Sequence, residues 1–212
     1  MTAEWYLNPA AWSYGFAALA FAAFAIQLSL GWRGGRASFF LLAAVILSAF
    51  WAAASCAFAV APSAAMWASA RVFDLLGVGA LLAFLISLFA PRQRPVWLVV
   101  VVAGLVLASL VQPAPPPGVP DLGRGTHMAL VEQVYRRTSE PRRWNVRPLC
   151  VGLAGIFAFD LVLYADAMMF RVLDEPLWAA RGAAHALVIP FLGIAASRNR
   201  QWDLDVTVSR GV

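Results

Sequence analysis

The chain has 212 residues, of which 62% are hydrophobic and 13% are charged, whereas soluble domains are roughly 45–50% apolar and about 25% charged. This composition predicts an integral membrane protein and excludes a large soluble catalytic domain within these residues. The net charge of +5 does not indicate a nucleic-acid partner, because all sixteen basic residues are arginines scattered between apolar runs, and their positions fit a role in membrane topology.

The apolar runs predict an all-α bundle of about seven transmembrane helices, since a span needs about 20 apolar residues. The fifth is the weakest, because Asp121, Arg124, His127 and Glu132 make it short and polar. In chain order the predicted spans are residues 11–31, 37–61, 67–90, 96–111, 119–135, 148–170 and 177–196, the last with a kink at Pro190.

The distribution of arginines predicts the orientation of these helices. If residues 119–135 cross the membrane, twelve of the sixteen arginines fall on one side: Arg33, Arg36, Arg92, Arg94, Arg136, Arg137, Arg142, Arg143, Arg147, Arg198, Arg200 and Arg210. Cytoplasmic loops carry an excess of arginine and lysine. The chain is therefore predicted to cross at 119–135, with its N-terminus outside and its C-terminus in the cytoplasm.

The last segment, residues 198–212, has a different pattern. From Trp202 to Ser209 apolar and polar side chains alternate strictly, which is typical of a strand or an extended linker. We expect it to be a cytoplasmic linker. The two cysteines, Cys56 and Cys150, fall at opposite membrane faces, so no disulfide between them is expected.

Acidic side chains interrupt the predicted sixth helix. Asp160 lies near the middle of the bilayer, and Tyr164, four residues later, shares its helix face, whereas Asp166 points roughly 240° away around the helix. An unpaired charge at the bilayer centre costs about 2.5–3.5 kcal/mol. Asp160 is therefore expected to have a partner on another helix, and Arg71 and Arg181 are the available arginines.

Two further pairs of polar residues share helix faces, one pair three residues apart on the third helix and one four apart on the seventh. The full set of candidate site residues is Arg71, Asp74, Asp160, Tyr164, Asp166, Arg181 and His185. One interpretation of these residues is a buried hydrogen-bonded network that determines which helices meet. A second is an outward-facing pocket whose ligand or protonation state changes helix packing. A proton or ion path is a third.

Enzyme and cofactor signatures are missing from the sequence. There is no glycine-rich phosphate loop, no CxxC and no HExxH, and two histidines on separate helices make a weak metal signal. Glu132 and Arg136 form a lone ExxxR, a fragment of intramembrane CAAX-type protease motifs without their other parts. The absence of lysine excludes a retinal Schiff base. We expect no catalytic residue, no metal and no cofactor in this chain.

Two stretches carry a resemblance to a known family. They are LVEQVYRRTSEPRRWNVRPLCVGLAGIFAFDLVLYADAMMFR, within residues 130–171, and WAARGAAHALVIPFLGIAASRNRQWDLDVTVSR, within residues 178–210. Together with SYGFAALAF and GWRG around the first helix, they resemble the N-terminal membrane region of the PrsK family, sensor histidine kinases of the PEP-CTERM/exosortase system. Positions that match the family pattern are Tyr135, Trp144, Asp160, Tyr164, Asp166, Arg181, Asn199, Trp202, Asp205 and Arg210.

The resemblance implies a function in two-component signal transduction. In that family the membrane region is followed by a further hydrophobic helix, a GAF-like domain, and the dimerisation and ATP-binding kinase domains. The resemblance therefore implies that the linker 198–212 is cut before a further helix and kinase modules, and that ATP and Mg²⁺ would be bound outside residues 1–212. The implied partners are the lipid bilayer of the bacterial inner membrane, a second copy in a homodimer, and a response regulator that controls genes for exopolysaccharide and PEP-CTERM protein export. The alternative is a small transporter or channel subunit with a polar intramembrane site.

Overall fold

In the computed structural model, residues 8–31, 34–88 and 140–199 are described. All regular structure in these ranges is helical. The helices are α1 (Pro9–Leu30), α2 (Arg36–Val60), α3 (Ala64–Ser87), α6 (Glu140–Phe170), α7 (Glu175–Ala186) and α8 (Ile189–Arg198).

Five segments among the described residues are long and apolar enough to cross a membrane. They are Pro9–Leu30, Arg36–Val60, Ala64–Ser87, Trp144–Ala167 and Glu175–Arg198. The protein is therefore a helical, multi-pass membrane protein. The predicted spans 96–111 and 119–135 and the linker pattern of residues 202–209 lie outside the described residues.

Local sequence signals account for three of the helix starts. The side chain of Asn8 accepts a hydrogen bond from the backbone N–H of Ala10, that of Ser63 from Met66, and that of Asp174 from Leu177. Asn, Ser and Asp are favoured N-caps because their side-chain oxygens satisfy backbone N–H groups that have no partner within the helix. Proline in the first turn of α1 and of α7 adds to these signals.

The sixth predicted helix begins earlier than residue 148, because Pro148 lies inside α6 rather than at its start. Proline has no N–H to donate to the carbonyl four residues earlier, here that of Trp144. A guanidinium nitrogen of Arg198, Nη1, donates to that carbonyl oxygen at 3.2 Å. A side chain from α8 therefore replaces the missing hydrogen bond, and α6 continues through the proline.

The seventh predicted helix is divided in two, α7 and α8, with Leu187 and Val188 between them. Pro190 lies in the first turn of α8, where its missing N–H leaves the carbonyl of Ala186 without a helical partner. The helical axis therefore breaks one turn after His185.

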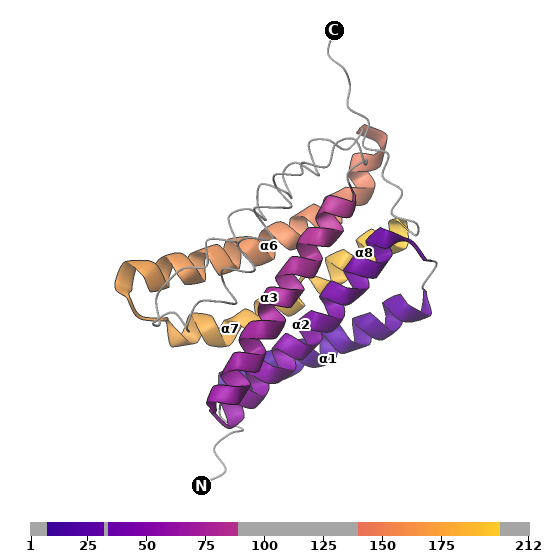
Figure 1. The fold of residues 1–212 in the computed structure, drawn as a ribbon. Coiled ribbons are helices and arrows are strands. Elements are labelled where there is room, and N and C mark those ends of the chain that lie inside the picture. The colour runs from indigo at the N-terminus through magenta and orange to yellow at the C-terminus, as the bar shows by residue number, and fades with distance from the viewer. Residues whose placement is uncertain (1–7, 32–33, 89–139, 200–212) are drawn as a thin grey trace.

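Figure 1 shows how these helices pack. Helices α1, α2 and α3 run alternately up and down side by side, and α6 forms a hairpin with α7 whose second arm continues through α8. Helix α7 packs mainly on α1, and α8 packs on α6. The buried core includes Tyr14, Phe21, Leu41, Phe84 and Leu153, and the helix pairs around it place the sixth and seventh spans beside the first three.

Candidate functional site: a buried arginine between two aspartates

Arg181 is the centre of the candidate site. Arg181 lies on α7 and is only 4% exposed, and Asp160 on α6 is 3% exposed. The guanidinium of Arg181 donates from Nε to Asp160 Oδ1 at 2.8 Å and from Nη2 to Asp160 Oδ2 at 3.3 Å. These two parallel bonds form the forked pairing that guanidinium and carboxylate groups favour.

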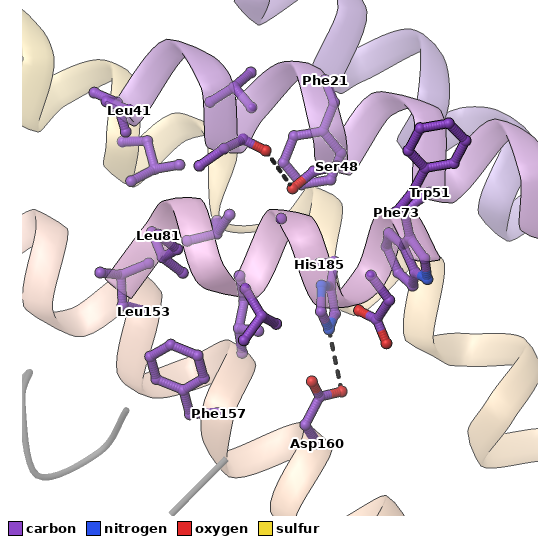
Figure 2. A pocket seen from close by; sticks show the side chains of 18 residues that line it. Phe21, Leu41, Ser48, Trp51, Phe73, Leu81, Leu153, Phe157, Asp160 and His185 are labelled. Carbon is purple, nitrogen blue, oxygen red and sulfur yellow. Dashed lines mark hydrogen bonds and ion pairs between the residues drawn. The ribbon is translucent and has the colours of Figure 1, made fainter. Parts of the chain in front are cut away.

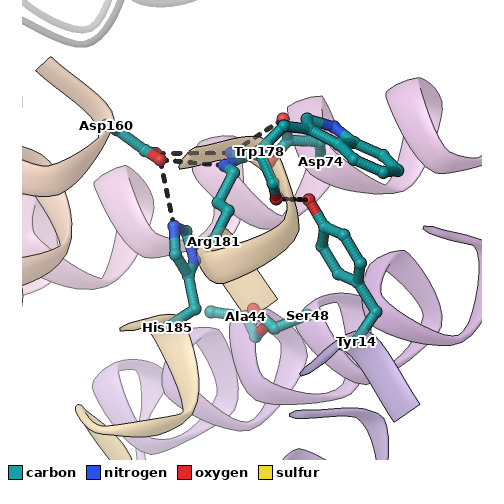
Figure 3. Close-up of polar contacts among 8 residues, drawn as sticks. All are labelled: Tyr14, Ala44, Ser48, Asp74, Asp160, Trp178, Arg181 and His185. Carbon is teal, nitrogen blue, oxygen red and sulfur yellow. Dashed lines mark hydrogen bonds and ion pairs between the residues drawn. The ribbon is translucent and has the colours of Figure 1, made fainter. Parts of the chain in front are cut away.

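The same guanidinium bonds a second carboxylate, on α3. Its Nη2 atom donates to Asp74 Oδ1 at 3.1 Å and to Asp74 Oδ2 at 3.2 Å. Figure 3 shows Arg181 between the two acids, with Asp160 on one side and Asp74 on the other. One cation thereby joins α6 and α7, which follow each other in the sequence, to α3, where Asp74 is 107 residues away from Arg181.

His185 lies one turn after Arg181 on the same helix. Its Nε2 atom is 3.1 Å from Asp160 Oδ1, so Asp160 contacts both polar side chains of α7. The imidazole ring also lies against the indole of Trp51 on α2, with ring centroids 4.8 Å apart. His185 therefore connects the charged cluster to a fourth helix.

Aromatic rings cover the guanidinium of Arg181. Its Cζ atom lies 4.7 Å from the ring centroid of Trp51 and 6.0 Å from that of Tyr164. Cations over aromatic faces are attracted by the ring quadrupole, more strongly when water is excluded. Trp51 is 4% exposed, so this contact lies in the interior of the protein.

Close contact between α1 and α7 fixes the position of Arg181. Tyr14 donates its hydroxyl proton to the carbonyl oxygen of Trp178 at 2.9 Å, and Ala183 N–H donates to Ser13 Oγ at 2.8 Å. A Cβ atom on Gly182 would lie 2.8 Å from backbone atoms of Ser13 and Tyr14. Only glycine lets the two backbones approach so closely, directly beside the arginine.

A cavity of about 60 Å³ begins at the charged cluster. Figure 2 shows its two parts: Asp160 and His185 lie together with Trp51 and Phe73, and the aliphatic side chains lie further along the bundle. The aliphatic part is lined by Leu41, Leu81, Leu153 and Leu192, among others. The cavity has room for a few water molecules, each of which needs roughly 10–15 Å³.

The structure brings together five of the seven predicted site residues and separates two. Asp74, Asp160, Tyr164, Arg181 and His185 form one cluster. Arg71, one of the two arginines considered for Asp160, is half-buried and lies 4.8 Å from the ring centroid of Trp67. Asp166 is half-buried and makes no ion pair with a described residue.

Sequence reasoning did not identify Tyr14, Trp51 or Gly182 as parts of the site. Each lies within an apolar or alanine-rich run, where aromatic and small residues are ordinary core residues. Gly182 follows Arg181 directly, and a glycine beside an intramembrane charge indicates close helix packing there. The two aromatic residues could not be found this way, because their role depends on which helices are neighbours.

The described residues contain neither a group of side chains suited to bind a metal ion nor a disulfide. There, no group of three or more His, Cys, Asp and Glu side chains could hold a metal ion. Cys56 on α2 and Cys150 on α6 are not joined by a disulfide, and Cys56 Sγ lies 3.3 Å from the carbonyl oxygen of Ala11.

Arg181 shares its guanidinium between two carboxylates on different helices. The guanidinium lies 3.1 Å from Asp74 and 2.8 Å from Asp160, and Asp160 also lies 3.1 Å from His185 Nε2. Burying a charge without compensation is costly in a low dielectric. A change in protonation or hydration would therefore alter the strength of the bonds between α3, α6 and α7.

We compared the chain with protein-family models, curated proteins and solved structures. No family model, no curated protein and no solved structure matches this chain.

Proposed function

We propose that the chain is the sensory membrane portion of a bacterial two-component histidine kinase, and that the Arg181 cluster is the part that responds to the cue. The observation that carries the proposal is the double pairing of Arg181 with Asp160 and Asp74. A guanidinium shared by two acids on different helices can strengthen one bond at the expense of the other, which gives the bundle two arrangements of similar energy.

The break between α7 and α8 provides a route from this cluster to the cytoplasmic side. Arg181 and His185 lie on α7, and the helix breaks one turn later, before Pro190. Helix α8 then leads to Arg198, where the predicted linker begins. A shift of α7 against α3 and α6 would therefore change the angle of α8 and move the linker.

A cue acts through such a site only if it binds the two arrangements with different affinity. The cavity beside Asp160 and His185 offers a place where water, a proton or a small ligand would have this effect. The resemblance to the PrsK family supports a kinase output and implies a homodimer, a cognate response regulator and the bacterial inner membrane. In this proposal the N-terminus lies outside.

A transporter or channel subunit is the rival proposal, and it would need a polar path across both halves of the membrane. Among the described residues, the cavity leads from the charged cluster to aliphatic side chains such as Leu41, Leu81 and Leu192. Of the described residues that line this further part of the cavity, none has an ionisable side chain. This distribution favours a closed switch over a conduction path.

The test fuses residues 1–212 to the dimerisation and ATP-binding domains of a histidine kinase and measures autophosphorylation in membrane vesicles. Asp160→Asn and Arg181→Gln each remove charge-assisted hydrogen bonds worth about 1.5–3 kcal/mol. If one of two states depends more on these bonds, its population changes by roughly tenfold. Autophosphorylation should therefore rise or fall severalfold in both variants.

Two matched substitutions control for the loss of charge itself. Asp166→Asn removes a carboxylate that makes no ion pair with a described residue, and Arg171→Gln removes an exposed arginine after α6. Both should leave autophosphorylation unchanged. Wild-type phosphorylation in Asp160→Asn and Arg181→Gln, with normal amounts of protein in the membrane, would rule out the sensory cluster.

A further inference from the structure

A second polar feature lies at the other end of the bundle, where α6 begins and α8 ends. Trp144 is 63% exposed although it is a large apolar side chain. The guanidinium carbons of Arg147 and Arg198 lie 5.9 and 5.6 Å from the centroid of its ring. Two exposed cations from different helices are thus held on one exposed indole, far from the Arg181 cluster.

Backbone contacts fix the position of these side chains. Besides the bond from Arg198 to the carbonyl oxygen of Trp144, Asn199 Nδ2 donates to the carbonyl oxygen of Asn145 at 3.0 Å. The end of α8 is therefore attached to the start of α6 at two adjacent carbonyls. The Nη2 and Nε atoms of Arg198 are not used in the bond to Trp144 and can donate elsewhere.

Exposed apolar side chains continue inward from both arginines. On α6, Val151 lies one turn beyond Arg147 and is 51% exposed. On α8, Ile194 lies one turn before Arg198 and is 43% exposed, and Phe191 one turn further is 39% exposed. Residues three and four apart share a helix face, so each arginine stands at the end of an apolar stripe.

The stripes lie beside a close contact between the two helices. A Cβ atom on Gly152 would lie 2.7 Å from Val188 Cγ2 and 2.9 Å from Phe191 Cβ. Gly152 therefore faces α8 directly, and Val151 beside it lies next to that seam. The surface has a cationic head and an apolar body, at a place where two candidate membrane spans end.

We propose that this surface, formed by Trp144, Arg147, Arg198, Val151, Ile194 and Phe191, binds one anionic phospholipid. The two guanidiniums bind the phosphate, a group that arginine recognises through paired N–H donors. Trp144 lies at the level of the headgroup, as tryptophan does at membrane interfaces. The acyl chains cover the two stripes. The site is separate from the proposed sensory cluster and does not depend on that function.

A lipid fits this surface better than free phosphate does. Free phosphate would use only the arginines and would leave Val151, Ile194 and Phe191 without a role. A phospholipid contacts both parts at once, and its headgroup lies where spans end. Anionic surfaces attract each nearby arginine by about 1 kcal/mol, which corresponds to roughly fivefold in affinity.

The test titrates the purified full chain, in a neutral detergent, with dioleoyl phosphatidylglycerol or dioleoyl phosphatidylcholine and counts bound lipids by native mass spectrometry. Phosphatidylglycerol should bind the wild-type chain at least tenfold more tightly. Arg147→Gln combined with Arg198→Gln should weaken phosphatidylglycerol binding by on the order of 20-fold and leave phosphatidylcholine binding unchanged. Arg147→Gln alone, which keeps the Arg198 backbone bond, should weaken it about fivefold.

A control variant removes the same net charge elsewhere: Arg36→Gln combined with Arg171→Gln, both exposed arginines outside the site. It should bind phosphatidylglycerol like the wild type. An equal loss in this control, or no preference for phosphatidylglycerol in the wild type, would overturn the proposal. Competition by inorganic phosphate or glycerol 3-phosphate as strong as that by the lipid would also overturn it, because the ligand would then be free phosphate.

Discussion

At the scale of single residues, Arg181 is the cation that holds the buried polar cluster together. It is nearly fully buried, it bonds two carboxylates, and an indole covers its guanidinium. Arginine suits this role because its planar group donates in several directions and stays charged. Lysine, a point charge on a flexible stem, could not bond Asp160 through two parallel N–H groups and reach Asp74 as well.

Loss of Arg181 should destabilise the protein more than loss of Asp160. Arg181→Gln removes the cation that the buried Asp160 and the half-buried Asp74 share, whereas Asp160→Asn leaves the arginine paired with Asp74. Removing one partner of a buried ion pair typically costs about 3–5 kcal/mol. We expect Arg181→Gln to lower the free energy of unfolding by an amount in this range and Asp160→Asn by clearly less.

Thermal unfolding of the purified chain in detergent, followed by circular dichroism, measures this difference. Asp166→Asn serves as the control and should unfold at the wild-type temperature, since Asp166 makes no ion pair with a described residue. Equal midpoints for Arg181→Gln and the wild type would show that the arginine contributes no net stability to the bundle.

At the scale of the helices, close approach between α1 and α7 is what places Arg181 opposite its acids. The contact consists of Gly182 against the backbone of Ser13, the Ser13–Ala183 hydrogen bond and the Tyr14–Trp178 hydrogen bond. In a bilayer, helices associate through close packing of small residues and through hydrogen bonds between helices. This contact uses both.

Gly182→Ala should therefore destabilise the bundle. The new methyl group would lie 2.8 Å from backbone atoms of Ser13 and Tyr14, so α1 and α7 would have to separate, at a cost of roughly 1–3 kcal/mol. Gly155→Ala on α6 is the matched control, because nothing lies within 4 Å of its Cβ position. A lower midpoint of thermal unfolding for Gly182→Ala alone is expected; equal midpoints would contradict the close contact.

The positions of most helices and the pairing of Asp160 with an arginine could be predicted from the sequence, for physical reasons. Long apolar runs indicate membrane-spanning helices directly. The cost of an unpaired charge in the bilayer led to the expectation that Asp160 meets an arginine from another helix. The choice of Arg181 over Arg71, and the addition of Asp74 to the same guanidinium, depend on helix rotation and could not be derived from spacing.

The start of α6 shows the opposite case. Proline usually marks a helix start, so residue 148 was a reasonable boundary. The helix instead continues back to Glu140, because Arg198 supplies the hydrogen bond that Pro148 cannot. A bond between residues so distant in the sequence leaves no local signal.

At the scale of the whole molecule, the direction of each helix limits how the rest of the chain crosses the membrane. Helices α1, α2 and α3 alternate in direction, and α6 begins at the end of the bundle where α3 ends (Figure 1). A segment whose two ends lie on one side of a membrane crosses it an even number of times. We therefore predict that the expected spans 96–111 and 119–135 cross together or not at all.

We predict that both cross, because residues 96–111 are apolar except for Ser109 and are long enough to enter the bilayer. The loop between these spans then lies outside, on the same side as the turn between α2 and α3. The measurement is labelling of single-cysteine variants in intact cells with a membrane-impermeant maleimide. Ala114→Cys reports on the loop, Pro62→Cys is the outside reference, and Ser197→Cys is the inside reference.

Labelling of Ala114→Cys and Pro62→Cys, without labelling of Ser197→Cys until the membrane is permeabilised, is expected. Protection of Ala114→Cys with labelling of Pro62→Cys would reduce the protein to the five spans of the described residues. The reverse pattern at the two reference positions would invert the orientation, and the arginine-rich end formed by Arg36, Arg147 and Arg198 would then face outside, against the positive-inside rule. One set of variants thus distinguishes the number of spans from their direction.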